Sequence, residues 1–171
     1  RYQEAIQPLR RAVVHPKTGE HRTQAWYRLV WSLFLTGDHT TASQEAKAFL
    51  KLRLDPGVAG DIHFVLAQIA AEAKQYSLAA TEYRAVVEQF PASRFVEKAA
   101  YGLGDMEYRA GEYARASRSF VSFLESYPES ALYDQALRWL AESLLRAEEY
   151  EEAARRITQL IERDPSHEDL D

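Results

Sequence analysis

The chain of 171 residues contains no cysteine. Disulfide frameworks and thiolate metal sites are therefore excluded, and the missing thiols fit an oxidising compartment without requiring one. No apolar run approaches the roughly 18 residues of a membrane-spanning helix, so no span is expected. The 21 Lys and Arg residues are scattered among 26 Asp and Glu, which gives a net charge of −5. A surface for nucleic acid or anionic lipid is therefore not expected.

Motifs that carry catalysis are also missing. The sequence has no glycine-rich phosphate loop, no Gly-x-Ser-x-Gly elbow and no His-Glu-x-x-His pair, and its 5 histidines show no metal-ligand spacing. Two of them, His39 and His63, stand at repeat positions where packing is the simpler interpretation. We therefore predict that the chain is not an enzyme and has no metal or cofactor.

The sequence is dominated by a repeat. Segments 73–91, 110–128 and 147–165 each begin with Ala, carry Tyr at the fourth place and Ala at the seventh, and end with Pro. They recur at a step of 37 residues, and the same step aligns an alanine column and a leucine column. These columns are Ala5, Ala42, Ala79, Ala116 and Ala153, and Leu29, Leu66, Leu103 and Leu140. Such a period predicts a stack of similar units, each too small to bury its apolar face alone.

Each unit is predicted to be a helical hairpin. Apolar residues recur within a unit at steps of three and four, which is the period of a helix. Gly37 and Gly111 fall where a helix would end in a left-handed residue. The alanine column, and Gly104 on the other helix, would let the two helices approach closely. A proline is expected to end each second helix and a serine to cap the next first helix: Pro16, Pro56, Pro91, Pro128 and Pro165, with Ser93, Ser130 and Ser166.

The fold class expected is all-α, in a single array over residues 1–171. It opens on a second helix over 2–15, continues through hairpins at about 22–53, 60–89, 94–126 and 131–163, and ends in a tail over 164–171. The start at Arg1, without Met or leader, suggests a piece of a longer protein. Ile6, Leu9 and Val13 are then expected to expose an apolar face that self-association or further repeats would cover. In the last helix, ion pairs are expected between Glu151 and Arg155 and between Glu152 and Arg156.

The columns resemble the tetratricopeptide repeat (TPR). The resemblance rests on a Leu-small pair, a Gly and Tyr at the turn, an Ala and an aromatic residue, and a closing Pro: Leu103, Gly104, Gly111, Tyr113, Ala116, Phe120 and Pro128. Two departures are a step of 37 residues instead of the family's usual 34, and Ala46 in place of an aromatic residue. Segments such as FPASRFVEKAAYGLG are similar to repeats of bacterial envelope TPR proteins of the BamD and CpoB types. The resemblance implies a right-handed superhelix of hairpins, in the periplasm or at the outer-membrane periphery, with the cytoplasm as the alternative.

In TPR stacks the first helices line a concave groove, so the resemblance also implies a binding surface. The positions carried over are Tyr27, Trp31, Phe34, Phe64, Gln68, Lys98, Tyr101, Asp105, Tyr108, Arg109, Arg138, Glu142 and Arg146, together with Gln24, Leu35, Asp61, Glu72 and Gln135. Aromatic and Arg side chains are usual anchors of protein interfaces. The alternative for Tyr27, Trp31 and Phe34 is that they only pack on one another or under an upstream helix.

The function implied is a non-catalytic scaffold that binds a peptide or helix of another protein, in the assembly of a bacterial envelope complex. The alternative is an architectural spacer or self-associating segment of a longer array. A clamp for a C-terminal carboxylate is not expected, because the chain has no Asn and the clamp positions hold Tyr27, Trp31, Phe64, Gln68, Tyr101 and Asp105. The groove changes from aromatic near Trp31 to mixed charge near Arg138, which would match a segment with an apolar half and an acidic half.

Overall fold

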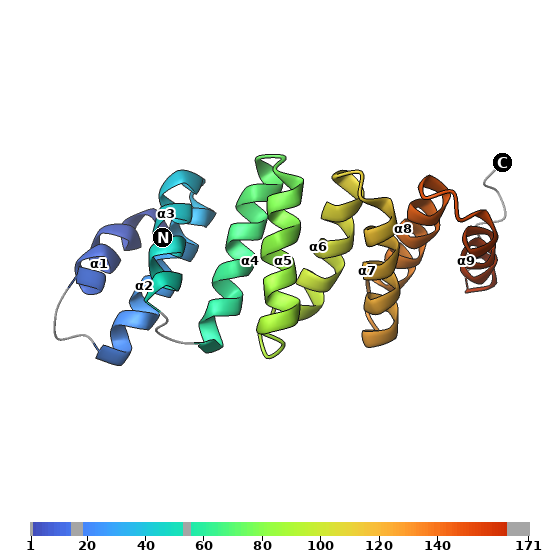
Figure 1. Ribbon diagram of the computed structural model, residues 1–171. Coiled ribbons are helices and arrows are strands. Elements are labelled where there is room, and N and C mark those ends of the chain that lie inside the picture. The colour runs from blue at the N-terminus through green and yellow to red at the C-terminus, as the bar shows by residue number, and fades with distance from the viewer. Residues whose placement is uncertain (1, 15–18, 53–55, 164–171) are drawn as a thin grey trace. The chain divides into compact units, whose positions relative to one another are not determined.

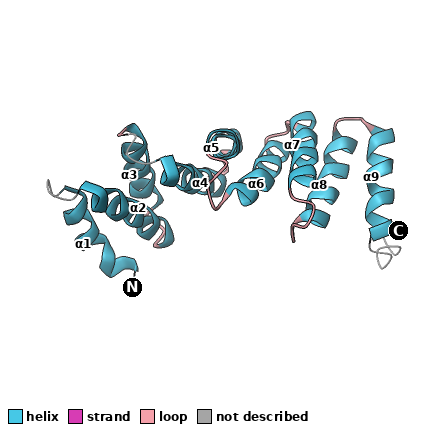
Figure 2. Ribbon diagram, turned by 90° about the horizontal axis from the view of Figure 1, so that it is seen from below, coloured by secondary structure: helices cyan, strands magenta, loops and turns pink. Residues whose placement is uncertain are grey.

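The computed structural model describes residues 2–14, 19–52 and 56–163. Within these ranges all regular secondary structure is helical, and Figure 2 shows only helices joined by loops. The helices are α1 Tyr2–Val14, α2 Gly19–Leu35, α3 His39–Lys51, α4 Pro56–Glu72, α5 Tyr76–Gln89, α6 Val96–Arg109, α7 Tyr113–Ser126, α8 Tyr133–Arg146 and α9 Tyr150–Arg163. The all-α class expected from the sequence is confirmed. By its contacts the chain divides into two compact units, Arg1–Val96 and Glu97–Asp171, and each is described by itself.

The first unit consists of a leading helix and two hairpins. α2 and α3 form one hairpin and α4 and α5 the next, and Figure 1 shows α4 and α5 side by side. α1 packs on α2, and both α2 and α3 contact α4. Most of the core comes from one cluster of buried side chains: Ile6, Val13, Trp26, Leu29, Val30, Leu33, Ala42, Ala46, Phe49, Ile62, Val65 and Leu66.

The second unit consists of two further hairpins. α7 packs against α8, and α8 packs against α9. α6 meets α7 through Gly104, where an added Cβ would lie only 2.8 Å from Cε1 of Phe120. The ring of Phe120 therefore occupies the space that any side chain at position 104 would need.

The repeat columns lie where the sequence placed them. Ala42, Ala79, Ala116 and Ala153 are all completely buried, and the leucine column is buried as well, whereas Ala5 at the head of the alanine column is only partly buried. Small residues on the second helices allow close helix–helix contact, as predicted. The hairpin phase derived from the sequence is therefore confirmed.

The four turns within hairpins share one backbone conformation but not one residue type. Gly37 and Gly111 have φ of 80° and 79°, as expected of a helix end in the left-handed region. Lys74 and Glu148 stand at the same repeat positions with φ of 58° and 63°. Since a Cβ disfavours this region, these two turns hold a strained residue that the other two avoid.

The expected exposure of the first helix was wrong. Ile6 and Val13 are each only 7% exposed, and both belong to the core that α1 shares with α2. Leu9 packs against the same cluster as a partly buried side chain. α1 corresponds to the second helix of a repeat unit, and it buries its apolar face on α2 of the following hairpin. This face therefore needs no upstream helix to cover it.

Two predicted details of the helix ends were also wrong. Pro56 begins α4 and does not end the helix before it, since α3 already stops at Lys51. Proline is well suited to the first position of a helix, where its missing N–H would be unpaired anyway. α4 therefore begins at Pro56, earlier than the predicted start at about 60. α2 also begins earlier than predicted, at Gly19 and not at about 22.

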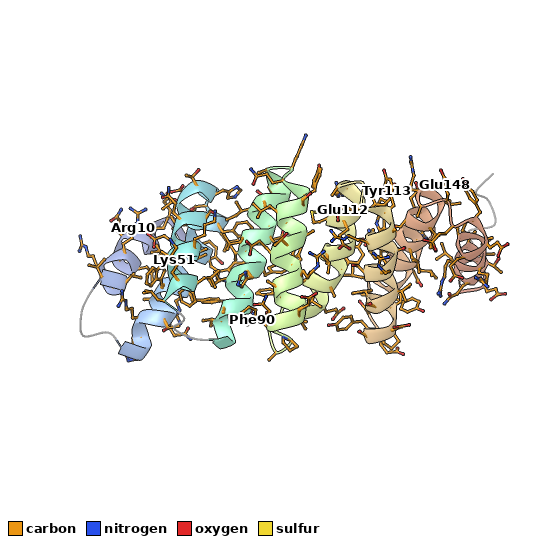
Figure 3. All side chains as sticks on the ribbon, viewed as in Figure 1. Arg10, Lys51, Phe90, Glu112, Tyr113 and Glu148 are labelled. Atoms are coloured by element: carbon orange, nitrogen blue, oxygen red, sulfur yellow. The ribbon has the colours of Figure 1, made fainter. Side chains whose placement is uncertain are left out.

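The two histidines at repeat positions have packing roles. The His39 ring stacks on Phe34, and its Nδ1 lies 3.3 Å from Glu72. The His63 ring stacks on Phe90, and its Nδ1 lies 2.7 Å from Glu82. Phe90 caps the end of α5 and is labelled in Figure 3. Both histidines therefore connect helices, as the packing interpretation expected.

On α9 the expected ion pairs are half correct. Arg156 pairs with Glu152, with Nε 2.8 Å from Oε1. Arg155 lies 2.5 Å from the other oxygen of the same carboxylate. It pairs with the residue three positions earlier and not with Glu151, because one carboxylate presents an oxygen to each guanidinium.

The junctions that precede α6 and α8 are built alike. Ser93 Oγ accepts a hydrogen bond from Phe95 N at 3.2 Å and donates one to Asp61 Oδ1 at 2.7 Å. Ser130 Oγ accepts from Leu132 N at 3.0 Å and donates to Glu97 Oε1 at 2.6 Å. Each serine thus fixes the turn that leads into a first helix and ties it to a carboxylate of the preceding first helix. The predicted helix cap at Ser130 was wrong, because Leu132 is the N-cap residue of α8 and no side chain caps that end. The predicted cap at Ser166 lies outside the described residues.

Candidate functional site

In the first unit, the predicted contact residues of α2 form a row of rings. Trp31 lies between Tyr27 and Phe34, with ring centroids 6.2 Å and 5.9 Å away. All three side chains are partly buried and partly open to solvent. They pack on one another, as the alternative interpretation expected, and they still present aromatic surface.

The predicted residues on α4 differ in exposure. Phe64 is only 6% exposed, since its ring stacks on Phe95 at 4.5 Å and meets Tyr83 edge-on. It therefore supports the surface from below and offers little area to a partner. Gln68 remains partly exposed.

A polar cluster lies beside these rings, centred on the Asp61 carboxylate. Asp61 is 6% exposed and accepts hydrogen bonds from Ser93 Oγ at 2.7 Å and from the Tyr27 hydroxyl at 3.1 Å. Arg94 Nε lies 3.1 Å from Asp61 Oδ2, and Arg94 Nη2 also donates to the Tyr27 hydroxyl. Burial, reinforced by the Asp61 carboxylate, raises the pKa of Tyr27 to about 12. Tyr27 is therefore a neutral donor at every physiological pH.

Arg94 and Phe95 complete this surface from the junction before α6. Phe95 stacks against Trp31 with ring centroids 5.4 Å apart. The Arg94 guanidinium lies 4.6 Å from the centroid of Phe95 and about equally far from Tyr27 and Trp31, at 5.8 Å and 6.0 Å. The sequence analysis did not name either residue as part of the site.

In the second unit, the predicted residues of α6 and α8 meet. The Tyr108 ring lies 5.0 Å from Trp139, and its hydroxyl donates to Glu142 Oε1 at 3.2 Å. Glu142 also accepts from Arg146 Nε at 2.9 Å. Burial and the Glu142 carboxylate raise the pKa of Tyr108. One carboxylate thus joins side chains of two first helices.

Other predicted residues of α6 lie along the same helix. Arg109 Nε donates to Asp105 Oδ1 at 2.8 Å, a pair that the Glu142–Arg146 pair repeats one step later. Tyr101 meets Phe120 and Phe123 edge-on, and burial followed by the Asp105 carboxylate raises its pKa to about 12. Tyr101 thus belongs partly to the core of its hairpin.

The basic residues of the second unit are the most accessible part of the predicted set. Lys98, Arg109, Arg138 and Arg146 are all exposed, whereas Asp105 and Glu142 are partly buried. On this face the positively charged side chains are therefore more exposed to solvent than the carboxylates. Such an arrangement suits recognition of acidic groups on a partner.

Four residues of these surfaces were missed from the sequence. They are Ser93, Arg94, Phe95 and Trp139. At the step of 37, Arg94 corresponds to Gly57 and Ala131 and departs from the repeat, whereas Phe95 corresponds to the apolar residues Val58 and Leu132. A charged residue in a column of small ones was therefore a signal for Arg94 alone.

Within the described residues, no group of three or more His, Asp or Glu side chains is placed to hold a metal ion. None of the helices in the described ranges has the length and apolarity needed to cross a bilayer.

Comparison with known proteins identifies the repeat. A sequence model described as tetratricopeptide repeat matches residues 27–94 and again residues 101–168, which together make up most of the chain. No curated protein matches.

Several solved structures share the fold. The chain is similar to MamA (41-end) from Desulfovibrio magneticus RS-1, with 23% identity and a TM-score of 0.71 over 98% of this chain and 88% of that one. It is also similar to YrrB, described as a TPR protein with an unusual peptide-binding site, with 17% identity and a TM-score of 0.68 over 96% and 82%. A third is PlcR from Bacillus thuringiensis in complex with the peptide PapR7 and DNA, with 18% identity and a TM-score of 0.59 over 97% and 65%. At these identities the likeness concerns the fold alone.

Proposed function

The chain belongs to the tetratricopeptide repeat family, and on this premise we propose that it is a non-catalytic scaffold that binds a peptide or helical segment of another protein. The binding surfaces are the first-helix faces: α2 with α4 in the first unit, and α6 with α8 in the second. YrrB and PlcR support this proposal as proteins of similar fold that are described with a peptide-binding site or a bound peptide.

The observation that carries the proposal is a contact made in both units. Tyr27 donates to Asp61, and Tyr108 donates to Glu142, each to a carboxylate 34 residues further along on the next first helix. Neighbouring first helices are thereby joined into one face that combines aromatic rings with charged groups. Preorganised aromatic and charged side chains bind a partner with little loss of side-chain entropy.

The two faces favour different chemistry in the bound segment. The first-unit face is mainly aromatic, around Trp31, and suits apolar or stacking side chains. The second-unit face exposes Lys98, Arg109, Arg138 and Arg146 and suits acidic side chains. A role in assembly of a bacterial envelope complex, at the periplasmic side, remains a prediction from the resemblance of the repeats.

A charge-reversal pair tests the second-unit face without removing core side chains. We expect Lys98→Glu with Arg138→Glu to weaken binding of acidic peptides, selected from a displayed library against the wild-type chain, by about tenfold or more in fluorescence anisotropy. The matched control is Lys47→Glu with Arg118→Glu, which makes the same charge change at exposed positions on the second helices α3 and α7. Equal loss in both variants, or no loss in either, would count against this face.

Self-association is a second candidate function. The exposed apolar side chains that could support it lie on α9 and not on α1. Ile157 and Ile161 on α9 are 37% and 38% exposed, whereas Ile6 and Val13 on α1 are buried. Concentration-dependent mass should therefore respond to Ile157→Glu and not to Leu9→Glu. A monomer at all concentrations for the wild-type chain would remove this candidate.

A further inference from the structure

Three aromatic rings and one carboxylate border the guanidinium of Arg94 on its protein side. The rings belong to Tyr27, Trp31 and Phe95, and the carboxylate to Asp61, which pairs with Arg94 Nε at 3.1 Å. Faces of aromatic rings attract cations through the ring quadrupole, and a carboxylate adds direct charge attraction. We call these four residues the aromatic cage.

The junction does not need the cage in order to close. The equivalent junction in the second unit joins Ser130 to Glu97 in the same way as Ser93 joins Asp61, yet it has Ala131 where Arg94 stands. The turn before α8 therefore forms this serine–carboxylate contact with no arginine beside it. A cation at position 94 is an addition to the repeated scaffold.

The cage itself is also absent from the other repeats. At the step of 37, Trp31 corresponds to Gln68, Asp105 and Glu142, and none of these carries a ring. Asp61 corresponds to Gln24, Lys98 and Gln135, and none of these carries an acid. The serine junction accounts for the Asp61 carboxylate, and Tyr27 corresponds to the aromatic residues Phe64 and Tyr101. Neither the junction nor the repeat accounts for Trp31 and Arg94 beside them.

The walls of the cage are held independently of Arg94. Tyr27 and Trp31 stand on α2, and Phe95 is held by its stack on Phe64 at 4.5 Å. The Arg94 side chain, in contrast, comes from a turn and is 64% exposed. Arg94 can therefore turn outward while the rings and the carboxylate keep their places.

We propose that Tyr27, Trp31, Phe95 and Asp61 form a binding site for an arginine side chain of the bound segment, with Arg94 as the resident cation that the incoming arginine displaces. A guanidinium fits this site better than an ammonium, because Asp61 and the Tyr27 hydroxyl accept from two different nitrogens of the planar group. The source of the incoming arginine rests on the proposed function, whereas the cage can be tested without any partner.

The test empties the cage and offers it a free cation. In Arg94→Ala, methylguanidinium chloride is titrated at constant ionic strength while the Trp31 indole N–H signal is followed by ¹⁵N NMR, assigned with Trp31→Phe. We expect a saturable shift at least about tenfold tighter than in the wild-type chain or in Arg94→Ala with Asp61→Asn. N-methylurea, which has the same shape without the charge, should produce no saturable shift.

If Arg94→Ala does not fold alone, the same cation serves as a rescuing ligand. Methylguanidinium should then restore the helical circular dichroism of Arg94→Ala but not of the double variant. The proposal is overturned if a folded Arg94→Ala shows no saturable shift, or if an unfolded one is not rescued. Neither of these outcomes affects the charge-reversal experiment on Lys98 and Arg138. The aromatic cage and the proposed scaffold function are therefore tested independently.

Discussion

Replacing Lys74 by glycine should stabilise the protein. Lys74 stands at the turn between α4 and α5 with φ of 58°, where Gly37 and Gly111 occupy the equivalent turns at 80° and 79°. A residue with a Cβ pays roughly 1–2 kcal/mol for the left-handed region. Glycine removes that strain but gains freedom in the unfolded chain, which costs about 0.4–1 kcal/mol. The net gain expected for Lys74→Gly is therefore about 0.5–1 kcal/mol.

Glu148→Gly, at the turn between α8 and α9, should behave similarly. Glu148 has φ of 63°, and it lies between the C-terminal end of α8 and the N-terminal end of α9 (Figure 3). Its negative charge is unfavourable at the first of these ends and favourable at the second, so the two helix-dipole effects oppose each other. The same holds for Lys74 between α4 and α5, with both signs reversed. Both glycine variants are therefore expected to be more stable than the wild type by a similar amount.

Urea denaturation followed by circular dichroism at 222 nm measures both changes. Lys74→Ala is the matched control, because it removes the same charge and keeps a Cβ in the left-handed region. Lys47→Gly is the second control, since it makes the same substitution inside α3 and should cost about 1 kcal/mol. If Lys74→Gly were no more stable than Lys74→Ala, the conformation of the turn would not be the source of strain, and the reasoning would be refuted.

Three further changes have defined outcomes. Gly104→Ala should destabilise the second unit by about 1–3 kcal/mol in thermal denaturation, because the new methyl group would lie 2.8 Å from the Phe120 ring; an unchanged midpoint would contradict the close approach. Ser130→Ala should cost about 1 kcal/mol by removing the donor to Glu97 and the acceptor for Leu132 N, whereas Ser122→Ala at an exposed site on α7 should not. In an absorbance titration at alkaline pH, Tyr27 and Tyr101 should ionise near pH 12, and Tyr27→Phe should remove part of that late phase. Because their folded-state pKa lies above the ordinary value of 10.0, their contribution to stability is complete below pH 10 and is lost as the pH rises towards 12.

The scaffold could be predicted from the sequence because it depends on repetition. Ala79, Ala116 and Ala153 stand at one phase, and the tight helix contact that each makes follows from side-chain size alone. The burial of Ile6 could not be read from the same pattern. The second helix of each repeat unit has apolar residues that face the first helix of the same unit and others that face the next hairpin. The periodicity of the sequence does not show which of these two neighbours is present.

The candidate site could be predicted only where it follows the repeat. Tyr108 and Glu142 were placed on first-helix faces by their positions in the unit, and the structure brings them together. Arg94, Phe95 and Trp139 were not named, because their roles depend on distances between hairpins that the repeat does not encode. The charge pattern likewise could not show that one carboxylate, Asp61, accepts from three different side chains.

The serine junction leaves the residue after it free to vary. Ser93 and Ser130 both complete their turns through a backbone amide and a carboxylate, and the next side chain is an arginine in one case and a methyl group in the other. If the aromatic cage binds a partner as proposed, a change at position 94 would alter recognition while the contact between Ser93 and Asp61 still holds the turn. On that proposal, a new partner requires only the exchange of a single residue at a joint between helices, and the helices themselves stay unchanged.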